Sequence, residues 1–150
     1  MSELKCIFCD IIAGKDSAFR IIEDELSMVI LDIQPYTKGH CLVIPKRHVQ
    51  WWHEMTDEET ASIFKHAKKT AEKLMAVFKP DFVSLTTRGR HVLHTHIHLI
   101  PTHSGDVIDS FYNALEKFQE DAGNIAKLRN EKVLVEAAEA IRNAVIKTKS

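Results

Sequence analysis

Three histidines alternate with other residues in the segment LHTHIHLI, which runs from Leu93 to Ile100. If this segment is a β-strand, its alternate side chains share one face and their backbones lie about 7 Å apart. His94, His96 and His98 would then be close enough for two imidazole rings to reach a single phosphate. A neutral imidazole can attack phosphorus, and a cationic neighbour can stabilise the charge on the phosphoryl oxygens. A solvated strand face is the alternative, but strict alternation beside an apolar set favours chemistry.

Two further groups of residues could bind a ligand. Cys6 and Cys9 form a C-x-x-C pair, whose thiolates could chelate one metal ion at the start of a helix, although a structural zinc site needs two more ligands. A redox pair and two buried thiols without metal remain open alternatives. Cys41, inside an apolar segment, is expected to be a core thiol. Asp32 could accept two hydrogen bonds from a vicinal diol, or it could simply begin a turn.

The elements that must position these residues follow from apolar periodicity and from turn residues. Thr56 and Glu59 predict a capping box for one long helix that ends near Phe78. Short β-prone segments separated by tight turns favour an antiparallel sheet of about five strands and an α+β fold. The expected strands are 18–22, 26–31, 40–44, 82–86 and 92–100. Pro45 is expected to end the strand 40–44, and Pro101 the strand 92–100. The expected helices are 6–13, 56–78, 107–121 and 131–147.

The composition restricts the class of protein. The chain has 150 residues, of which 45% are hydrophobic and 27% are charged, as in one globular domain. A net charge of −1 argues against nucleic-acid binding by bulk electrostatics. The three cysteines are an odd number and do not suggest a secreted disulfide framework. The sequence also shows no basic segment followed by an apolar run and no apolar stretch of membrane-spanning length. We therefore expect a cytoplasmic protein that does not bind membranes. His53 and His66 are expected on the surface.

Taken together, these motifs resemble the histidine triad (HIT) family, whose signature H-x-H-x-H followed by apolar residues is matched from His94 to Ile100. The segment LDIQPYTKGHCLVIPKRHV, from Leu31 to Val49, resembles the family's strand-turn-strand unit, and CIFCDIIAG, from Cys6 to Gly14, resembles its N-terminal start. The resemblance covers about residues 6–101. It implies a HIT-like α+β domain over residues 1–105 and a helical extension over residues 106–150 that packs on the same domain.

The resemblance also implies roles for individual residues. His96 matches the nucleophile that attacks the α-phosphate of a purine nucleotide conjugate, and His98 and His40 match the histidines that contact the phosphate. His94 completes the catalytic triad. Asp32 matches the residue that holds the ribose hydroxyls. The residues expected to line the base and sugar pocket are Ile7, Phe8, Ile11, Ile30 and Ile33.

Zinc and a homodimer are also expected from the resemblance. Some family members bind structural zinc through the positions of Cys6, Cys9, His48 and His94. The expected activity is that of a nucleotide phosphoramidase or dinucleoside polyphosphate hydrolase. A zinc-stabilised nucleotide-binding regulatory protein with little catalysis, and a thiol-disulfide protein, are the alternatives.

One segment departs from the family pattern. Family members usually carry Asn-Asn-Gly and then Gly-Gln before the triad. In this chain residues 84–93 read SLTTRGRHVL, and the segment is shorter than in those members. Arg90 and His91 stand where the glutamine and its neighbour bind phosphate and the leaving group. Arg88 and Arg90 could still bind phosphate as cations. The preferred leaving group and the activity on standard substrates are therefore open.

Overall fold

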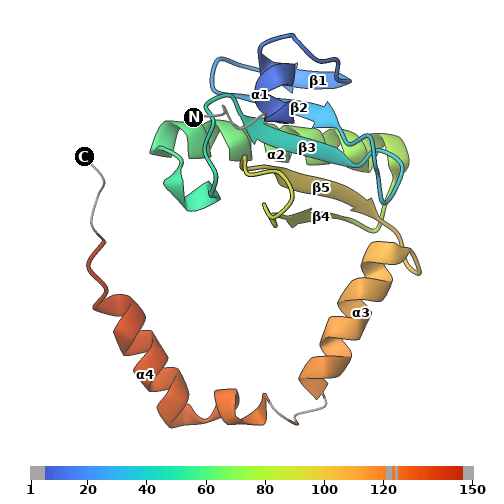
Figure 1. The fold of residues 1–150 in the computed structure, drawn as a ribbon. Coiled ribbons are helices and arrows are strands. Elements are labelled where there is room, and N and C mark those ends of the chain that lie inside the picture. Colours follow the sequence, from blue (N-terminus) through green and yellow to red (C-terminus); the bar gives the residue numbers. More distant parts are fainter. Residues whose placement is uncertain (1–5, 121–122, 124, 147–150) are drawn as a thin grey trace. The chain divides into compact units, whose positions relative to one another are not determined.

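A computed structural model describes residues 6–120, 123 and 125–146 of the chain. The chain divides into two compact units that meet between Asp109 and Ser110. The first unit contains a five-stranded antiparallel sheet in the order β1-β2-β3-β5-β4 (Figure 1). The predicted α+β class, with about five antiparallel strands and one long helix, is confirmed.

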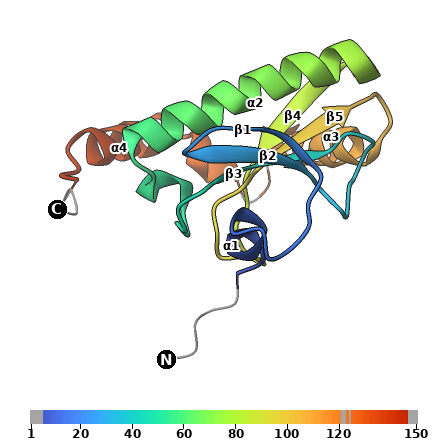
Figure 2. The same cartoon turned by 90° about the horizontal axis from the view of Figure 1, so that it is seen from above.

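The strands are β1 (Arg20–Glu23), β2 (Ser27–Leu31), β3 (Cys41–Pro45), β4 (Phe82–Thr86) and β5 (Ile97–Thr102). The helices of the first unit are α1 (Ile7–Ile12), the short 3-10 helix η1 (Trp52–Glu54) and α2 (Asp57–Phe78). The sheet lies between two helical layers, with α2 along one face and α1 against the other (Figure 2).

Alternation along the strands produces two apolar clusters, one on each face of the sheet. One cluster joins the sheet to α2 and contains Val29, Cys41, Val43, Ile63, Ala67, Leu74, Ile97 and Leu99. The other joins the sheet to α1 and contains Phe8, Ile11, Met28, Ile30, Leu42 and Ile44. Phe8 and Ile11 are the buried side chains of the short helix α1. Ile7, on the same helix, is 41% exposed.

The long helix begins and ends where its sequence predicts. The side chain of Thr56 accepts a hydrogen bond from the Glu59 backbone N–H, and Glu59 accepts one from the Thr56 backbone N–H. At its other end Phe78 packs against Gly39, whose φ is +90°. A Cβ atom at Gly39 would lie 2.4 Å from a ring carbon of Phe78, so only glycine fits this turn. The turn leads directly into His40 and so fixes where that ring enters the site.

The histidine segment is less regular than its alternation predicts. Strand β5 begins at Ile97, so His98 lies in the strand whereas His94 and His96 precede it. The prediction of a strand from Val92 was therefore wrong over its first five residues. The physical reason is that the backbone N–H of Thr95 donates to the carbonyl of Val49, in a loop, at 2.7 Å. The sheet hydrogen bonds begin only after that contact, so the three rings do not share one strand face.

Two prolines lie inside strands rather than beyond them, contrary to prediction. Pro45 closes β3 opposite Ser27, and Pro101 pairs with Val83 inside β5. The β3–β5 ladder contains only the pairs from Val43–Ile97 to Cys41–Leu99. Both prolines lie beyond the ends of the β3–β5 ladder. The N–H that each proline lacks is therefore not needed for hydrogen bonds between these two strands.

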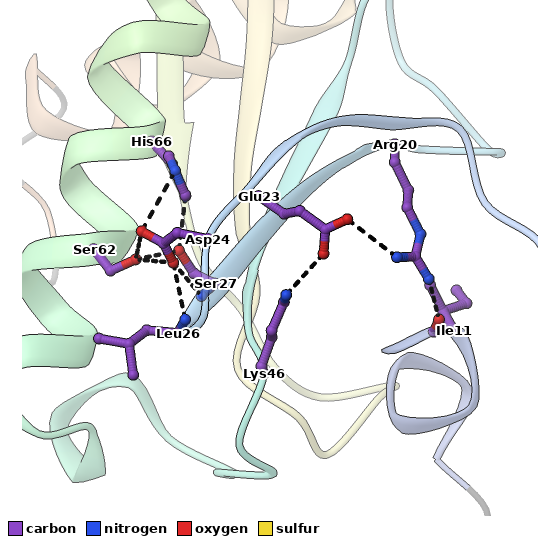
Figure 3. Close-up of polar contacts among 9 residues, drawn as sticks. All are labelled: Ile11, Arg20, Glu23, Asp24, Leu26, Ser27, Lys46, Ser62 and His66. Carbon is purple, nitrogen blue, oxygen red and sulfur yellow. Dashed lines mark hydrogen bonds and ion pairs between the residues drawn. The ribbon is translucent and has the colours of Figure 1, made fainter. Parts of the chain in front are cut away.

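His66 is buried, which corrects the prediction that it lies on the surface. Its Nδ1 atom lies 2.8 Å from the Ser27 hydroxyl and its Nε2 atom lies 3.6 Å from an Asp24 carboxylate oxygen. Ser62 bridges the same aspartate and serine, at 2.9 and 2.6 Å (Figure 3). This cluster joins α2 to the turn between β1 and β2. Burial lowers the pKa of His66, although Asp24 opposes the shift.

After the sheet come the helices α3 (Val107–Glu120) and α4 (Glu131–Arg142) with a 3-10 turn, η2 (Ala126–Arg129), between them. The boundary between the two units falls inside the first turn of α3, so the rest of α3 and all of α4 belong to the second unit. The predicted end of the first helix at residue 121 and the last residue of the second, 147, lie outside the described residues. The predicted helix 131–147 was wrong over residues 143–146, because α4 ends at Arg142 and Asn143 caps it. Packing of residues 106–150 on the first unit stays a prediction. Within the described ranges, every helix is too short or too polar to cross a membrane.

Candidate functional site

The backbone beside the triad fixes the proton of one histidine. The Nδ1 atom of His96 lies 2.7 Å from the carbonyl oxygen of His94. A carbonyl only accepts hydrogen bonds, so Nδ1 carries the proton and the lone pair of the neutral ring is on Nε2. The hydroxyl of Thr87 donates to the carbonyl of His96 itself at 2.8 Å. The loop before β5 therefore fixes both the backbone and the ring of His96, and it leaves Nε2 as the basic nitrogen.

A second hydrogen-bond chain ends at His98. The backbone N–H of Tyr36 donates to His40 Nδ1 at 3.3 Å, which places the proton of a neutral His40 on Nε2. That nitrogen lies 2.9 Å from His98 Nδ1 and donates to it. His98 must then carry its own proton on Nε2. The ring centroids of His96 and His98 are 5.0 Å apart, so one basic nitrogen and one N–H donor come from neighbouring rings.

Burial keeps these two supporting rings neutral. The pKa of His98 is lowered to about 4, mainly by burial and further by His96 and His40, while Asp32 opposes the shift. Burial also lowers the pKa of His40, again against Asp32. A carboxylate oxygen of Asp32 lies 3.6 Å from His40 Nδ1 and 4.0 Å from His98 Nδ1. Near pH 7 both rings therefore donate hydrogen bonds without carrying a full charge.

A cavity of about 700 Å³ opens beside these rings. This volume is within the range of pockets that enclose a drug-sized ligand, and it would accommodate a nucleoside monophosphate. His96 and His98 line it, whereas His40 lies behind His98 and His94 lies outside the lining. All eight of the residues predicted to bind nucleotide line this cavity: Ile7, Phe8, Ile11, Ile30, Asp32, Ile33, Arg90 and His91.

Sequence reasoning missed two aromatic residues in this wall. Tyr36 lines the cavity and stacks on His40, with ring centroids 5.4 Å apart and planes at 17°. Its position four residues before His40 in a tight turn was the available signal. Phe19 also lines the cavity and is 68% exposed. Its position in a short link between α1 and β1 gave no periodic signal.

A cluster of two thiols and two imidazoles lies on the other side of Phe8. One ligand atom from each of Cys6, Cys9, His48 and His94 can be chosen so that all four lie within 4.8 Å of one another. Cys9 Sγ lies 3.2 Å from His48 Nδ1, and Cys6 Sγ lies 3.4 Å from His94 Nδ1. Around a tetrahedral zinc ion, sulfur and nitrogen ligands would be about 3.5 Å apart. The donor set and its spacing therefore fit zinc.

The contacts around this cluster also fit a metal. His94 Nε2 lies 2.9 Å from the carbonyl of Pro45 and donates to it, which leaves Nδ1 as the ligand atom. Burial and the adjacent Cys6 raise the pKa of Cys9 to about 11, so a nearby cation would be needed to keep it as a thiolate. His94 thus belongs to the candidate metal cluster by its side chain, and its carbonyl accepts the hydrogen bond from His96 beside the cavity.

Helix α1 connects the metal cluster to the cavity. Cys6 precedes the helix and Cys9 lies inside it, and Phe8 between them packs against His94 and His96 at centroid distances of 5.7 and 5.3 Å. At the other end of the helix, Arg20 donates to the Ile11 carbonyl at 2.7 Å and pairs with Glu23 (Figure 3). The helix that forms the apolar wall of the cavity is therefore fixed at both ends.

Comparison with known proteins places this arrangement in a family. Residues 13–105 match the model of the HIT domain. The adenosine 5′-monophosphoramidase of Schizosaccharomyces pombe is 39% identical over 102 residues, which are 65% of this chain and 74% of that protein.

Solved structures give the same result. A crystal structure of a HIT family member from Bacillus subtilis is similar with a TM-score of 0.77 and 30% identity, over 95% of this chain and 99% of that one. A zinc-bound histidine triad protein from Mycobacterium smegmatis is similar with a TM-score of 0.64 and 33% identity, over 69% and 79% of the two chains. The family model and the solved structures agree with each other, and this chain belongs to the HIT domain family.

Proposed function

We propose that this protein is a nucleotide hydrolase or nucleotidyl transferase that acts at the α-phosphate of a purine nucleotide conjugate. The observation that carries the proposal is the hydrogen bond from His96 Nδ1 to the His94 carbonyl, which leaves a basic Nε2 beside a cavity of nucleotide size. Its relative in Schizosaccharomyces pombe, named as an adenosine 5′-monophosphoramidase, supports the same chemistry.

In the first step His96 Nε2 attacks the α-phosphorus and a nitrogen–phosphorus bond forms. The bond from phosphorus to the leaving group breaks, and its electron pair leaves with that group, which takes up one proton. The His96 ring becomes a cation, because Nδ1 keeps its hydrogen. The His94 carbonyl oxygen, 2.7 Å from Nδ1, accepts a hydrogen bond from this N–H and so stabilises the cation.

In the second step a water molecule attacks the same phosphorus. The new oxygen–phosphorus bond replaces the bond to His96, one proton is released, and the neutral ring is restored. An alcohol or amine acceptor in place of water would give nucleotidyl transfer. In both steps the N–H on His98 Nε2 would donate to a phosphoryl oxygen, and His40 would hold His98 in that orientation.

Other residues would bind the rest of the substrate. Asp32 has one carboxylate oxygen that accepts from the Gln34 N–H at 2.8 Å, which orients the group for a ribose diol. Phe8, Ile11 and Ile30 would enclose the base. The cations of Arg88 and Arg90, both in the cavity wall, would neutralise phosphate charge.

Zinc would have a structural role. Cys6, Cys9, His48 and His94 would hold it, and it would fix α1 and the His94 backbone against which His96 is oriented. Zinc in the structure of the Mycobacterium smegmatis relative supports this assignment. No step of the reaction passes through the metal.

We propose a homodimer as the assembly, supported by β4 at the edge of the sheet and by Leu85 on it, which is 47% exposed. A cytoplasmic location is proposed from the three free cysteines, which a reducing compartment would preserve.

The function is tested by replacing His96 with alanine. Turnover of adenosine 5′-phosphoramidate should fall by at least about a thousandfold, since loss of a nucleophile commonly costs that much or more, while AMP still binds. His103→Ala is the matched control, because this exposed histidine lies outside the cavity lining. Full turnover by His96→Ala would exclude the mechanism. Tight AMP binding by the wild-type protein without turnover of any conjugate would instead favour a regulatory nucleotide-binding protein, which the exposed Arg90 and His91 in the wall suggest.

A further inference from the structure

Phe19 is a large apolar residue that lies outside the core. It belongs to the link between α1 and β1, its side chain is 68% exposed, and neither apolar cluster of the sheet contains it. It nevertheless lines the nucleotide-sized cavity. Phe19 therefore has apolar surface that water contacts in the free protein and that a ligand in the cavity would cover.

Two hydrogen bonds place Phe19 between two parts of the proposed nucleotide site. The backbone N–H of Leu31, the residue before Asp32, donates to the Phe19 carbonyl at 2.9 Å. Arg20, the residue after Phe19, donates from its guanidinium to the Ile11 carbonyl at 2.7 Å (Figure 3). Ile11 is in the wall proposed for the base, and Asp32 is proposed to hold the ribose. The backbone of Phe19 is thus held near both groups.

The other two phenylalanine and tyrosine rings of the cavity wall already pack against histidines. Phe8 packs edge-on against His96, and Tyr36 stacks on His40 with their planes at 17°. Phe19 makes no ring contact of this kind with any residue that the structure describes. Its face is therefore available for another flat ring, and aromatic rings pack best in offset-stacked or edge-on arrangements.

We propose that Phe19 is a specificity-determining residue whose ring stacks on the base of the bound nucleotide and favours a purine. The proposal rests on the function proposed above and deepens it, because it names the group that selects the base. Ile11 and Ile30 give the base aliphatic contacts, whereas only an aromatic ring can stack on its face. A purine has two fused rings and overlaps a phenyl ring over a larger area than a pyrimidine does, so stacking on Phe19 favours AMP over CMP.

The first test measures the binding of AMP, CMP and ribose 5-phosphate by isothermal titration calorimetry. Phe19→Ala should weaken the binding of AMP by about tenfold, in the range expected for the loss of one base–aromatic stack. The binding of CMP should weaken less, and that of ribose 5-phosphate, which has no base, should not change. Phe64→Ala is the matched control, because this phenylalanine on α2 is also exposed but lies outside the cavity lining.

A conservative variant separates stacking from simple apolar contact. Phe19→Leu keeps an apolar side chain of similar reach but has no ring, so it should recover only part of the affinity for AMP that Phe19→Ala loses. Because Phe19 is mostly exposed, both variants should fold, and urea denaturation should give nearly the same free energy of unfolding for each of them as for the wild-type protein.

The second test reads the stack directly by fluorescence. In Phe19→Trp the new indole should be quenched by AMP and not by ribose 5-phosphate, since only AMP brings a base to stack on it. The wild-type protein supplies the baseline, because its two tryptophans, Trp51 and Trp52, do not line this cavity.

The outcomes separate this proposal from the proposed function. Unchanged affinity for AMP in Phe19→Ala, equal losses for AMP and ribose 5-phosphate, or full recovery in Phe19→Leu would each reject stacking on Phe19. Equal quenching of Phe19→Trp by AMP and ribose 5-phosphate would also reject it. If AMP binds as expected but the wild-type protein hydrolyses no nucleoside 5′-phosphoramidate, the proposed function fails and the role of Phe19 stands. If the wild-type protein does not bind AMP, both fail.

Discussion

The Nδ1 atom of His96 lies 2.7 Å from the carbonyl oxygen of His94, two residues earlier in the chain. This contact ties the tautomer of the proposed nucleophile to the backbone of a residue whose own ring faces two cysteines. The same segment therefore belongs to the candidate metal cluster and to the proposed reaction site, so a change in the metal cluster should be measurable in the reaction.

Loss of the candidate metal ligands should reduce both zinc content and nucleotide affinity. Elemental analysis of the purified wild-type protein should give about one zinc ion per chain, as a four-ligand structural site requires, and Cys6→Ser should retain much less. Nucleotide should also bind more weakly, because α1 carries Phe8 and Ile11. Cys41→Ala is the matched control, since that thiol is buried apart from the cluster. Equal zinc in the wild-type and Cys6→Ser proteins would remove Cys6 as a ligand.

Truncation of Phe8 should affect stability and binding together. Phe8 is 6% exposed and contacts both His94 and His96, so Phe8→Ala should lower the free energy of unfolding by about 3 kcal/mol and raise KM. Urea denaturation and steady-state kinetics measure the two effects. Ile7→Ala, one residue earlier and 41% exposed, should cost much less. Equal loss of stability in the two variants would contradict the assigned burial.

Asp32 should determine the preference for ribose. In Asp32→Asn one acceptor oxygen is replaced by an amide donor, and the hydrogen bonds to a charged acceptor are lost. The kcat/KM ratio of ribonucleotide to 2′-deoxyribonucleotide substrates should therefore fall by about tenfold or more. Equal losses on both substrates would show that Asp32 acts through the nearby imidazoles rather than on the sugar.

Acid should destabilise the fold through the buried histidines. The folded-state pKa of His98, about 4, lies below its ordinary value, so the unfolded chain binds more protons between roughly pH 6.5 and 4. Stability should fall as the pH drops through that window, and below it His98 should contribute no further loss. The contribution of His98 should be about 3 kcal/mol. Denaturation curves from pH 7.5 to 4 for the wild-type protein and His98→Gln would measure it, and identical slopes would contradict it.

Much of the fold could be predicted from local patterns. The capping residues Thr56 and Glu59 predicted the start of α2, and apolar alternation predicted four of the five strands within two residues and placed the start of β5 five residues too early. The eight residues predicted for the nucleotide pocket line one cavity, to which α1, β2 with the turn after it, and the loop before β5 each contribute.

The errors have a common physical origin in tertiary hydrogen bonds. His66 has the periodicity of an exposed helix position, yet Ser27 and Asp24 bind its ring from another element. The residues before Ile97 alternate like a strand, but Thr95 bonds to the Val49 loop instead of to the sheet. Neither partner is close in sequence, so no local pattern could have revealed them. Sequence reasoning also missed a smaller cavity of about 200 Å³ between residues 50–53 and residues 87–89, because these two segments meet only after folding.

The most direct measurement is mass spectrometry of protein quenched in alkali during turnover of a nucleoside 5′-phosphoramidate. Fragment ions should place a covalent nucleoside monophosphate on His96, and the adduct should be absent from His96→Gln. An adduct on His94 or His98, or sustained turnover by His96→Gln without any adduct, would contradict nucleophilic attack by His96.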